Sequence, residues 1–174
     1  MKNKTSYQQV ANSYAAGSTD EWYTPRYITD ALGEFDLDPC APASVPEGFP
    51  SVAKHSFTIE DDGTQQDWSP YGRVWLNPPY SNVNPFIEKM CEHNNGIALL
   101  FNRQDTKIWQ QRIAKTATAM LFLSGRVKFV QPDGTLKAGA TCGSVLIAWG
   151  RENADVLRAS GLDGFYVEFM GGGK

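Results

Sequence analysis

Apolar runs alternate with amphipathic stretches along most of the chain. This pattern predicts β-strands at 35–37, 57–59, 73–76, 96–101, 119–123, 127–130, 144–149 and 165–169. It predicts helices at 24–32, 85–92, 105–115 and 153–160. Such alternation is typical of an α/β domain with a mainly parallel sheet. A hairpin in the C-terminal part, interrupted at Gly125, predicts that antiparallel strands are added there.

The 174 residues suit a single domain with a sizeable core. Residues 1–19 are polar and rich in small side chains, which predicts a flexible N-terminal arm. Residues 20–174 then form the domain. Two polar loops are expected inside it, at 42–50 and 60–67, the first with three prolines and a glycine.

Cysteine usage and hydropathy narrow the class of protein. Cys40, Cys91 and Cys142 are isolated from one another, and neither His55 nor His93 lies at metal-ligand spacing from them. The sequence therefore predicts neither a metal site nor a disulfide framework. No apolar run is long enough to cross a membrane, and no signal peptide follows Met1. A reduced protein of the cytoplasm is expected.

The charge distribution is uneven, although the net charge is only −3. Acidic residues dominate before Asn77, whereas residues 101–140 carry seven basic side chains against two acidic ones. Such a stretch fits one side of a phosphate backbone. The alternative is that these charges are solvated faces of two surface elements.

The four residues Asn77-Pro78-Pro79-Tyr80, directly after a predicted strand, carry the clearest chemistry. Such a string suits a transferase that acts on an aromatic amine, such as that of adenine. The lone pair of this amine is delocalised into the ring, so the enzyme has to draw the nitrogen toward tetrahedral geometry before it can attack a methyl donor. The Asn77 side-chain carbonyl and the Pro78 backbone carbonyl are two acceptors for its N–H groups, and the two prolines make the loop rigid. The Tyr80 ring offers a surface on which an extruded base stacks.

A second polar string, Asp38-Pro39-Cys40-Ala41, also follows a predicted strand. In open α/β sheets, ligands bind beyond the carboxyl ends of the strands. We therefore expect Asp38 and Asn77 to lie at the same edge of the sheet.

The sequence resembles the phage-type DNA adenine-N(6)-methyltransferases, a Dam-like family of phages and prophages, from residue 20 to about residue 149. The resemblance rests on Glu21 to Pro25, Phe35 to Ala41, Asp67-Trp68, Val74 to Ser81, the segment 103–109, and Leu123 to Phe129. It implies a Rossmann-like fold, S-adenosylmethionine as the methyl donor, and adenine in duplex DNA as the substrate. It also implies a phage- or prophage-encoded enzyme acting in the bacterial cytoplasm, without metal.

The resemblance also implies a set of donor-binding residues. Asp38-Pro39-Cys40-Ala41 matches the family's first cofactor motif, without the Gly-x-Gly of many methyltransferases, and Asp38 is expected to bind the donor's ammonium. Trp22, Thr24 and Pro25 match the segment that closes over the methionine end of the donor. Asp67-Trp68 matches a position beside the donor's adenine ring.

Contacts to DNA are expected from residues on both sides of this centre: Ser81, Arg103, Arg126, Lys128 and Phe129. Phe129 either packs against the flipped base or fills the core. Arg103, with Asp105 and Thr106, either touches phosphate or fixes the catalytic loop. Base recognition is expected from the loops 131–142 or 42–50, and the base must leave the duplex to reach the site.

Two alternatives remain. One is methylation of another planar amine, such as that of cytosine, of a base in RNA, or of protein glutamine. Cytosine-amine enzymes generally begin the tetrapeptide with Ser, and the RNA and glutamine enzymes usually have a glycine-rich first motif and a separate substrate domain. The last alternative is an inactive DNA-binding relative, although all four catalytic positions are intact.

Overall fold

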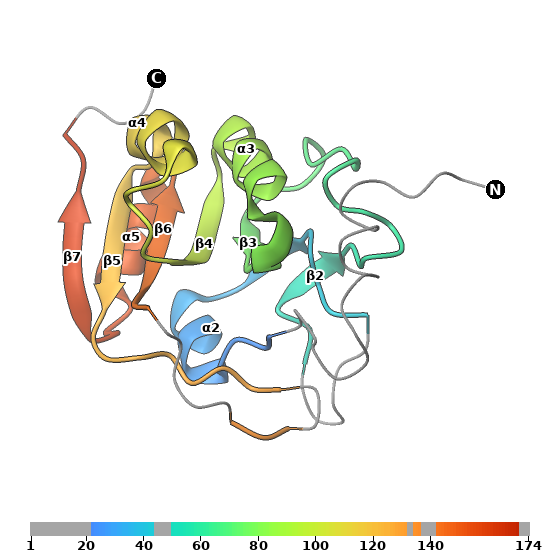
Figure 1. Cartoon of the computed structure of the whole chain (residues 1–174), viewed down its shortest axis with the longest axis horizontal. Coiled ribbons are helices and arrows are strands. Elements are labelled where there is room, and N and C mark those ends of the chain that lie inside the picture. Colours follow the sequence, from blue (N-terminus) through green and yellow to red (C-terminus); the bar gives the residue numbers. More distant parts are fainter. Residues whose placement is uncertain (1–21, 44–49, 132–133, 137–141, 171–174) are drawn as a thin grey trace.

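The computed structural model describes residues 22–43, 50–131, 134–136 and 142–170, and their strands form one seven-stranded sheet (Figure 1). The order across the sheet is β2-β1-β3-β4-β6-β5-β7. The strands are β1 (Phe35–Asp38), β2 (Ala53–Ser56), β3 (Val74–Leu76), β4 (Gly96–Phe101), β5 (Ala119–Leu123), β6 (Ser144–Trp149) and β7 (Gly164–Glu168).

Strand direction brings several carboxyl ends to one edge of the sheet. Strands β1 to β4 pair in parallel, while β6 is antiparallel to both β4 and β5. Strand β5 therefore runs in the same direction as β1 to β4, opposite to β6 and β7 (Figure 1). The predicted α/β class is confirmed, and antiparallel strands occur in the C-terminal part. The sheet is mixed, with three parallel and three antiparallel strand pairs. The hairpin expected across Gly125 is absent from the described residues, because β5 pairs with β6 and β7 and not with 127–130. This mixed sheet is compatible with the Rossmann-like fold that the resemblance implies.

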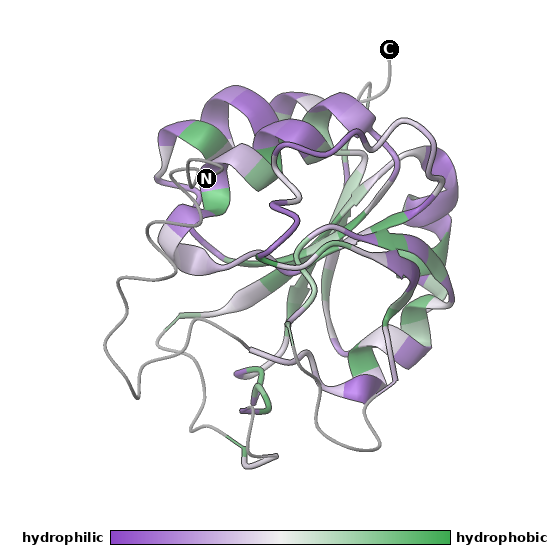
Figure 2. Ribbon diagram, turned by 90° about the vertical axis from the view of Figure 1, so that its right-hand side faces the viewer, coloured by the Kyte–Doolittle hydropathy of each residue, from purple (hydrophilic) through white to green (hydrophobic). Residues whose placement is uncertain are grey.

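Helices cover both faces of the sheet. Helix α3 (Val83–His93) and the π-helical turn η2 (Trp109–Ile113) pack on one face, and α2 (Arg26–Leu32) and α5 (Arg151–Ala159) pack on the other. The short helix α4 (Ala114–Thr116) continues η2, and the 3-10 turn η1 (Tyr80–Asn82) precedes α3. Figure 2 shows apolar strands between helices whose outer faces are polar.

The central strands are apolar throughout because both of their faces are covered. In β3, Val74 and Leu76 join the core beneath α3, while Trp75 joins the core beneath α2 and α5. All three side chains are buried. A continuous apolar run, rather than an alternating one, is what a strand buried on both faces requires.

Two of the predicted strands are wrong. Residues 127–130 join no ladder, and Val130 makes only isolated bridges to Tyr23 and Leu136. The predicted alternation nevertheless holds, since Val127 and Phe129 are buried while Arg126 and Lys128 are exposed. The other error is at 57–59.

The strand near 57–59 is β2, which ends before Phe57. Only Ala53 of its four residues is buried, so the strand lacks an apolar pattern. The predicted helices are present within a few residues of the expected ends, except that 105–115 contains the π-helical turn. The N-terminal arm and most of the loops 42–50 and 131–142 lie outside the described residues.

Within the described ranges, no helix is long and apolar enough to cross a membrane. The same residues contain no cluster of three or more potential metal ligands. Cys40, Cys91 and Cys142 are free thiols.

Candidate active site

The loops that follow β1 and β3 meet at the carboxyl edge of the sheet. The Cys40 thiol donates a hydrogen bond to the backbone carbonyl of Asn77, with an Sγ···O distance of 3.3 Å. Burial, reinforced by the neighbouring Asp38 charge, raises the pKa of this thiol well above its ordinary value. Cys40 therefore stays protonated and joins the two loops as a donor. The expected convergence of Asp38 and Asn77 on one edge is confirmed.

The side chain of Asn77 is fixed through its nitrogen. Asn77 Nδ2 donates to the backbone carbonyl of Trp22 at 2.9 Å and to Thr24 Oγ1 at 3.2 Å. Asn77 Oδ1 is buried and accepts no hydrogen bond from the part of the chain that the structure describes. A buried acceptor without a donor is uncommon in folded proteins and calls for a partner. A group that carries an N–H would satisfy this oxygen.

A cavity of about 230 Å³ lies beside Asn77. Its walls come from the segment before α2, the loop after β1, and both ends of β2. It is lined by Trp22, Tyr23, Thr24, Asp38, Cys40, Ala41, Pro42, Pro50, Ser51, Val52, Ser56, Thr58, Trp75 and Asn77.

Asp38 is the carboxylate of this cavity and is only 6% exposed. Burial raises its pKa to about 7, although the backbone N–H of Cys40, at 3.1 Å from Oδ1, opposes this shift. No lysine or arginine of the described residues pairs with it. Among the described residues this buried carboxylate lacks a cation that would compensate for its desolvation, and a cationic ligand would supply one.

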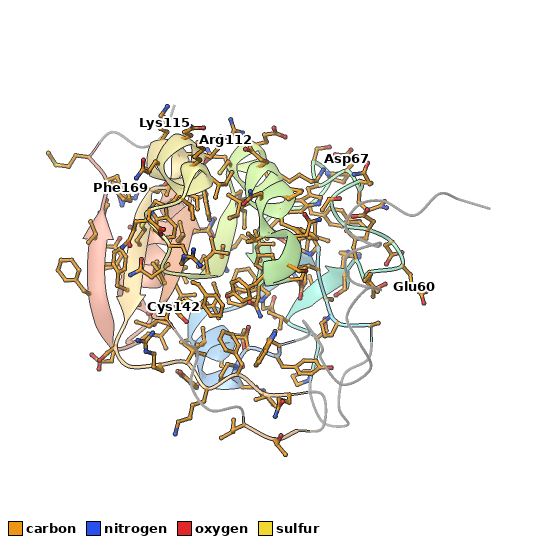
Figure 3. The ribbon with its side chains drawn as sticks, viewed as in Figure 1. Glu60, Asp67, Arg112, Lys115, Cys142 and Phe169 are labelled. Carbon is orange, nitrogen blue, oxygen red and sulfur yellow. The ribbon has the colours of Figure 1, made fainter. Side chains whose placement is uncertain are left out.

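Asp67 and Trp68 do not line the cavity. Asp67 is exposed, accepts hydrogen bonds from Ser69, and lies at the periphery of the molecule (Figure 3). Trp68 is buried and donates from Nε1 to the carbonyl of Gly63 at 2.8 Å. A Cβ on Gly63 would lie 1.8 Å from the backbone oxygen of Pro39. Trp68 thus supports the loop after β1 from behind.

The hydroxyl-bearing wall of the cavity was missed by sequence reasoning. Ser51, Ser56 and Thr58 belong to β2 and its flanks, and Phe57 makes backbone hydrogen bonds with Asp38 and Ala41 on the neighbouring loop. The available signal was the cluster of Ser and Thr around a strand-length segment after the first motif. That signal is weak, because β2 has no alternating apolar residues.

Four aromatic rings form a continuous chain at this edge. Tyr80 stacks on Phe101, with centroids 3.7 Å apart and planes at 9°. Phe101 meets Phe129 edge-on, at 6.4 Å and 84°. Phe129 in turn meets Trp22 at 6.1 Å and 75°. Phe129 is buried, so it belongs to the core as well as to the surroundings of Tyr80.

The remaining predicted DNA contacts lie around this edge. Ser81 is half-buried in η1, and Arg103 is exposed at 3.6 Å from Asp105. Arg126 and Lys128 are exposed in the segment after β5 and pair with no carboxylate of the described residues.

The rest of the basic stretch is placed differently. Arg112 pairs with Glu88 and Glu92 of α3. Lys115 lies in α4, just before β5 and hence toward the amino end of that strand (Figure 3).

Comparison with known proteins shows the family to which the chain belongs. A family model described as DNA N-6-adenine-methyltransferase (Dam) matches residues 13–158. The DNA N-6-adenine-methyltransferase of Escherichia phage T1 is 27% identical over 150 residues, covering 73% of this chain and 61% of the relative. That of Haemophilus phage HP1 is 28% identical over 125 residues, covering 66% of this chain and 68% of the relative. The chain thus spans less than two thirds of the phage T1 relative. With most of its length matched, the chain belongs to the DNA N-6-adenine-methyltransferase (Dam) family.

Proposed function

We propose that the protein transfers a methyl group from S-adenosylmethionine to the exocyclic amine of adenine in DNA, on a Rossmann-like methyltransferase fold. The observation that carries this proposal is the hydrogen bonding of the Asn77 side-chain amide. Its nitrogen is engaged by Trp22 and Thr24, and its buried oxygen has no donor among the described residues. An aromatic amine presents the N–H that this oxygen lacks.

The two carbonyls of the loop perform the activation. Asn77 Oδ1 and the Pro78 backbone oxygen accept from the two N–H groups of the amine and draw its lone pair out of conjugation. The donor, when bound, supplies a methyl group on a sulfonium centre. As the N–C bond forms and the C–S bond breaks, the amine nitrogen becomes cationic. The two acceptors stabilise that charge before a proton leaves to solvent.

We assign the donor to the cavity beside Asn77. Asp38 binds its ammonium, and Trp22, Thr24, Cys40 and Ala41 surround its methionine end, in the roles expected from the sequence. Pro39 and Pro25 do not line the cavity and act indirectly, Pro39 by supporting Asp38 and Pro25 by preceding α2.

The adenosine end of the donor meets a different wall from the one expected. Ser56 and Thr58 are the hydroxyl groups that β2 places in the cavity. They take the polar role that the resemblance gave to Asp67, and Trp68 supports the site through Gly63 and Pro39.

We assign the DNA-facing side to the segment after β5. Arg126 and Lys128 project into solvent from a segment that leaves the same edge as the loop with Asn77. Arg103 and Ser81 lie on the two neighbouring loops. Base recognition is expected from one of the loops 131–142 and 42–50, most of whose residues lie outside the described ranges.

DNA from cells that express the protein, sequenced for modified bases, tests this function. We expect N6-methyladenine within a fixed sequence context, and none in cells expressing Asn77→Ala. Modified cytosine would favour the alternative amine. Unmodified DNA together with retained donor binding by calorimetry would indicate an inactive relative.

A further inference from the structure

The ring of Phe101 lies between the two aromatic residues that are expected to contact the target base. Tyr80 is the stacking surface for that base, and Phe129 is its candidate lateral neighbour. Phe101 is stacked flat on Tyr80 at 3.7 Å and stands perpendicular to Phe129. These are the two ring geometries that aromatic systems prefer. A purine held by Tyr80 and Phe129 would use the same contacts.

The residues around Phe101 form a closed circuit. Phe129 contacts the Trp22 ring, and the Trp22 carbonyl accepts from Asn77. Asn77 is linked to Tyr80 along the backbone through Pro78 and Pro79. Phe101 thus belongs to a closed ring of contacts that also includes the Asn77 amide, the group proposed to activate the target amine.

We propose that Phe101 is a placeholder, which occupies the target base's stacking position on Tyr80 in the DNA-free protein and leaves it when the base enters. This inference rests on the proposed function. It assigns a role to a residue in which the sequence showed only the end of a buried strand.

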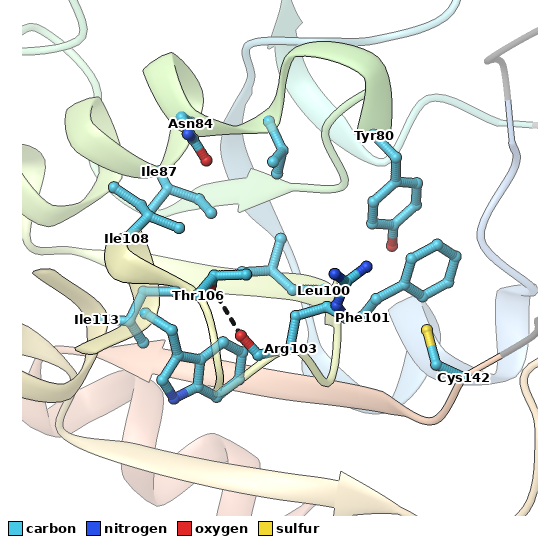
Figure 4. A pocket seen from close by; sticks show the side chains of 12 residues that line it. Tyr80, Asn84, Ile87, Leu100, Phe101, Arg103, Thr106, Ile108, Ile113 and Cys142 are labelled. Carbon is cyan, nitrogen blue, oxygen red and sulfur yellow. Dashed lines mark hydrogen bonds between the residues drawn. The ribbon is translucent and has the colours of Figure 1, made fainter. Parts of the chain in front are cut away.

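A cavity next to the stack offers room for the Phe101 ring once the base displaces it. Phe101 and Tyr80 line a second cavity of about 330 Å³, whose other walls include Leu100, Ile87 and Ile113 (Figure 4). Asn84, Arg103 and Thr106 add polar groups to its lining. A wholly apolar cavity of about 150 Å³ is already enough to bind benzene, so this larger one has room for a phenyl ring. The backbone of Phe101 pairs with Ser144 in the sheet, so only the side chain has to rotate.

The stack also gives the exchange a physical basis. It covers one face of Tyr80 while no base is present. An entering base replaces the ring contact with its own stacking on Tyr80, which is generally stronger than one aromatic pair. Phe101 therefore competes with the base, and removing its ring should favour base entry.

The test measures binding of two duplexes that contain the methylated sequence found above, one with the target adenine and one with an abasic site there. The readout is the Kd for the abasic duplex divided by the Kd for the duplex with the target adenine. This ratio measures how much the target base contributes to binding when it enters the site. Phe101→Leu should raise this ratio by about two- to tenfold, since an aromatic pair contributes about that factor. Phe101→Trp, which keeps a stacking ring, should leave the ratio at or below the wild-type value.

Phe122→Leu is the matched control. Phe122 is half-buried in β5 and contacts Phe165 instead of the site, so its variant should lower stability without changing the ratio. An unchanged or lower ratio in Phe101→Leu would overturn the placeholder role and make Phe101 a fixed support for Tyr80. Failure of the proposed function would look different, because the wild-type protein would then methylate no adenine.

Discussion

The side-chain nitrogen of Asn77 donates to the backbone carbonyl of Trp22 at 2.9 Å, across 55 positions of sequence. This hydrogen bond joins the loop that we propose binds the target amine to the segment expected to close over the methyl donor. It also engages the nitrogen of the amide, so that the oxygen is the atom left to accept. In the proposed mechanism, one side chain thereby connects the site of the methyl donor with the site of the target amine.

Replacing Asn77 by Ala should lower kcat by at least about a hundredfold, the usual effect of removing one preorganised polar group from a reaction centre. Asn77→Asp should retain more activity than Asn77→Ala, because a carboxylate oxygen still accepts from the amine. Single-turnover methylation measures both variants, and calorimetry should show donor affinity within a few-fold of wild type. Wild-type turnover in Asn77→Ala would remove Asn77 from the mechanism.

Donor affinity should depend on pH through Asp38. Burial raises the pKa of this carboxyl to about 7, and only its ionised form pairs with an ammonium. Between pH 6 and pH 7 the ionised fraction, and with it the affinity, should rise about fivefold, below the range in which an α-amino group titrates. Calorimetry at several pH values measures this slope.

Asp38→Asn supplies the control for that slope. The variant should bind the donor roughly ten- to a hundredfold more weakly, as expected for loss of a charged hydrogen bond, and its affinity should be flat between pH 6 and pH 7. If wild type and variant show the same pH profile, Asp38 does not carry the titration.

Gly63→Ala should weaken donor binding and lower the melting temperature. The added Cβ would lie 1.8 Å from the backbone oxygen of Pro39, so the loop that carries Asp38 has to shift. Gly143→Ala is the matched control, because a Cβ there meets nothing within 4 Å. Thermal melting with and without donor compares the two, and equal behaviour would show that the close contact is unimportant.

Arg126→Ala and Lys128→Ala should each raise the DNA Kd and lower the magnitude of the salt slope by about 0.9 per lost phosphate contact. Both side chains are exposed in the segment after β5. Lys115→Ala tests an exposed lysine toward the opposite edge and should leave the slope unchanged. Binding titrations at several salt concentrations measure these slopes. If all three variants keep the wild-type slope, Arg126 and Lys128 do not contact phosphate, and Arg103 and Lys107 become the next candidates.

The sequence was most informative where one local pattern determines the structure. The strands at 96–101, 119–123 and 144–149 have the predicted ends, because continuous apolar runs belong to strands covered on both faces. The meeting of Asp38 and Asn77 followed from strand direction alone. It needed only the rule that parallel strands end at a common edge.

What escaped prediction depends on tertiary contacts. Strand β2 is polar and forms only because β1 offers an open edge, so the cavity wall of Ser51, Ser56 and Thr58 had no periodic signal. The stack of Phe101 on Tyr80 joins the end of strand β4 to the turn η1, which no local pattern encodes. For the same reason, Trp68 proved to be a support for Gly63 instead of a wall of the cavity.

The central claim is tested most directly by incubating purified protein with DNA and isotope-labelled S-adenosylmethionine and analysing the digested nucleosides by mass spectrometry. We predict label in N6-methyldeoxyadenosine with wild-type protein and none above background with Asn77→Ala. Label in methylated deoxycytidine, or no labelled nucleoside from a protein that binds both donor and DNA, would contradict the account.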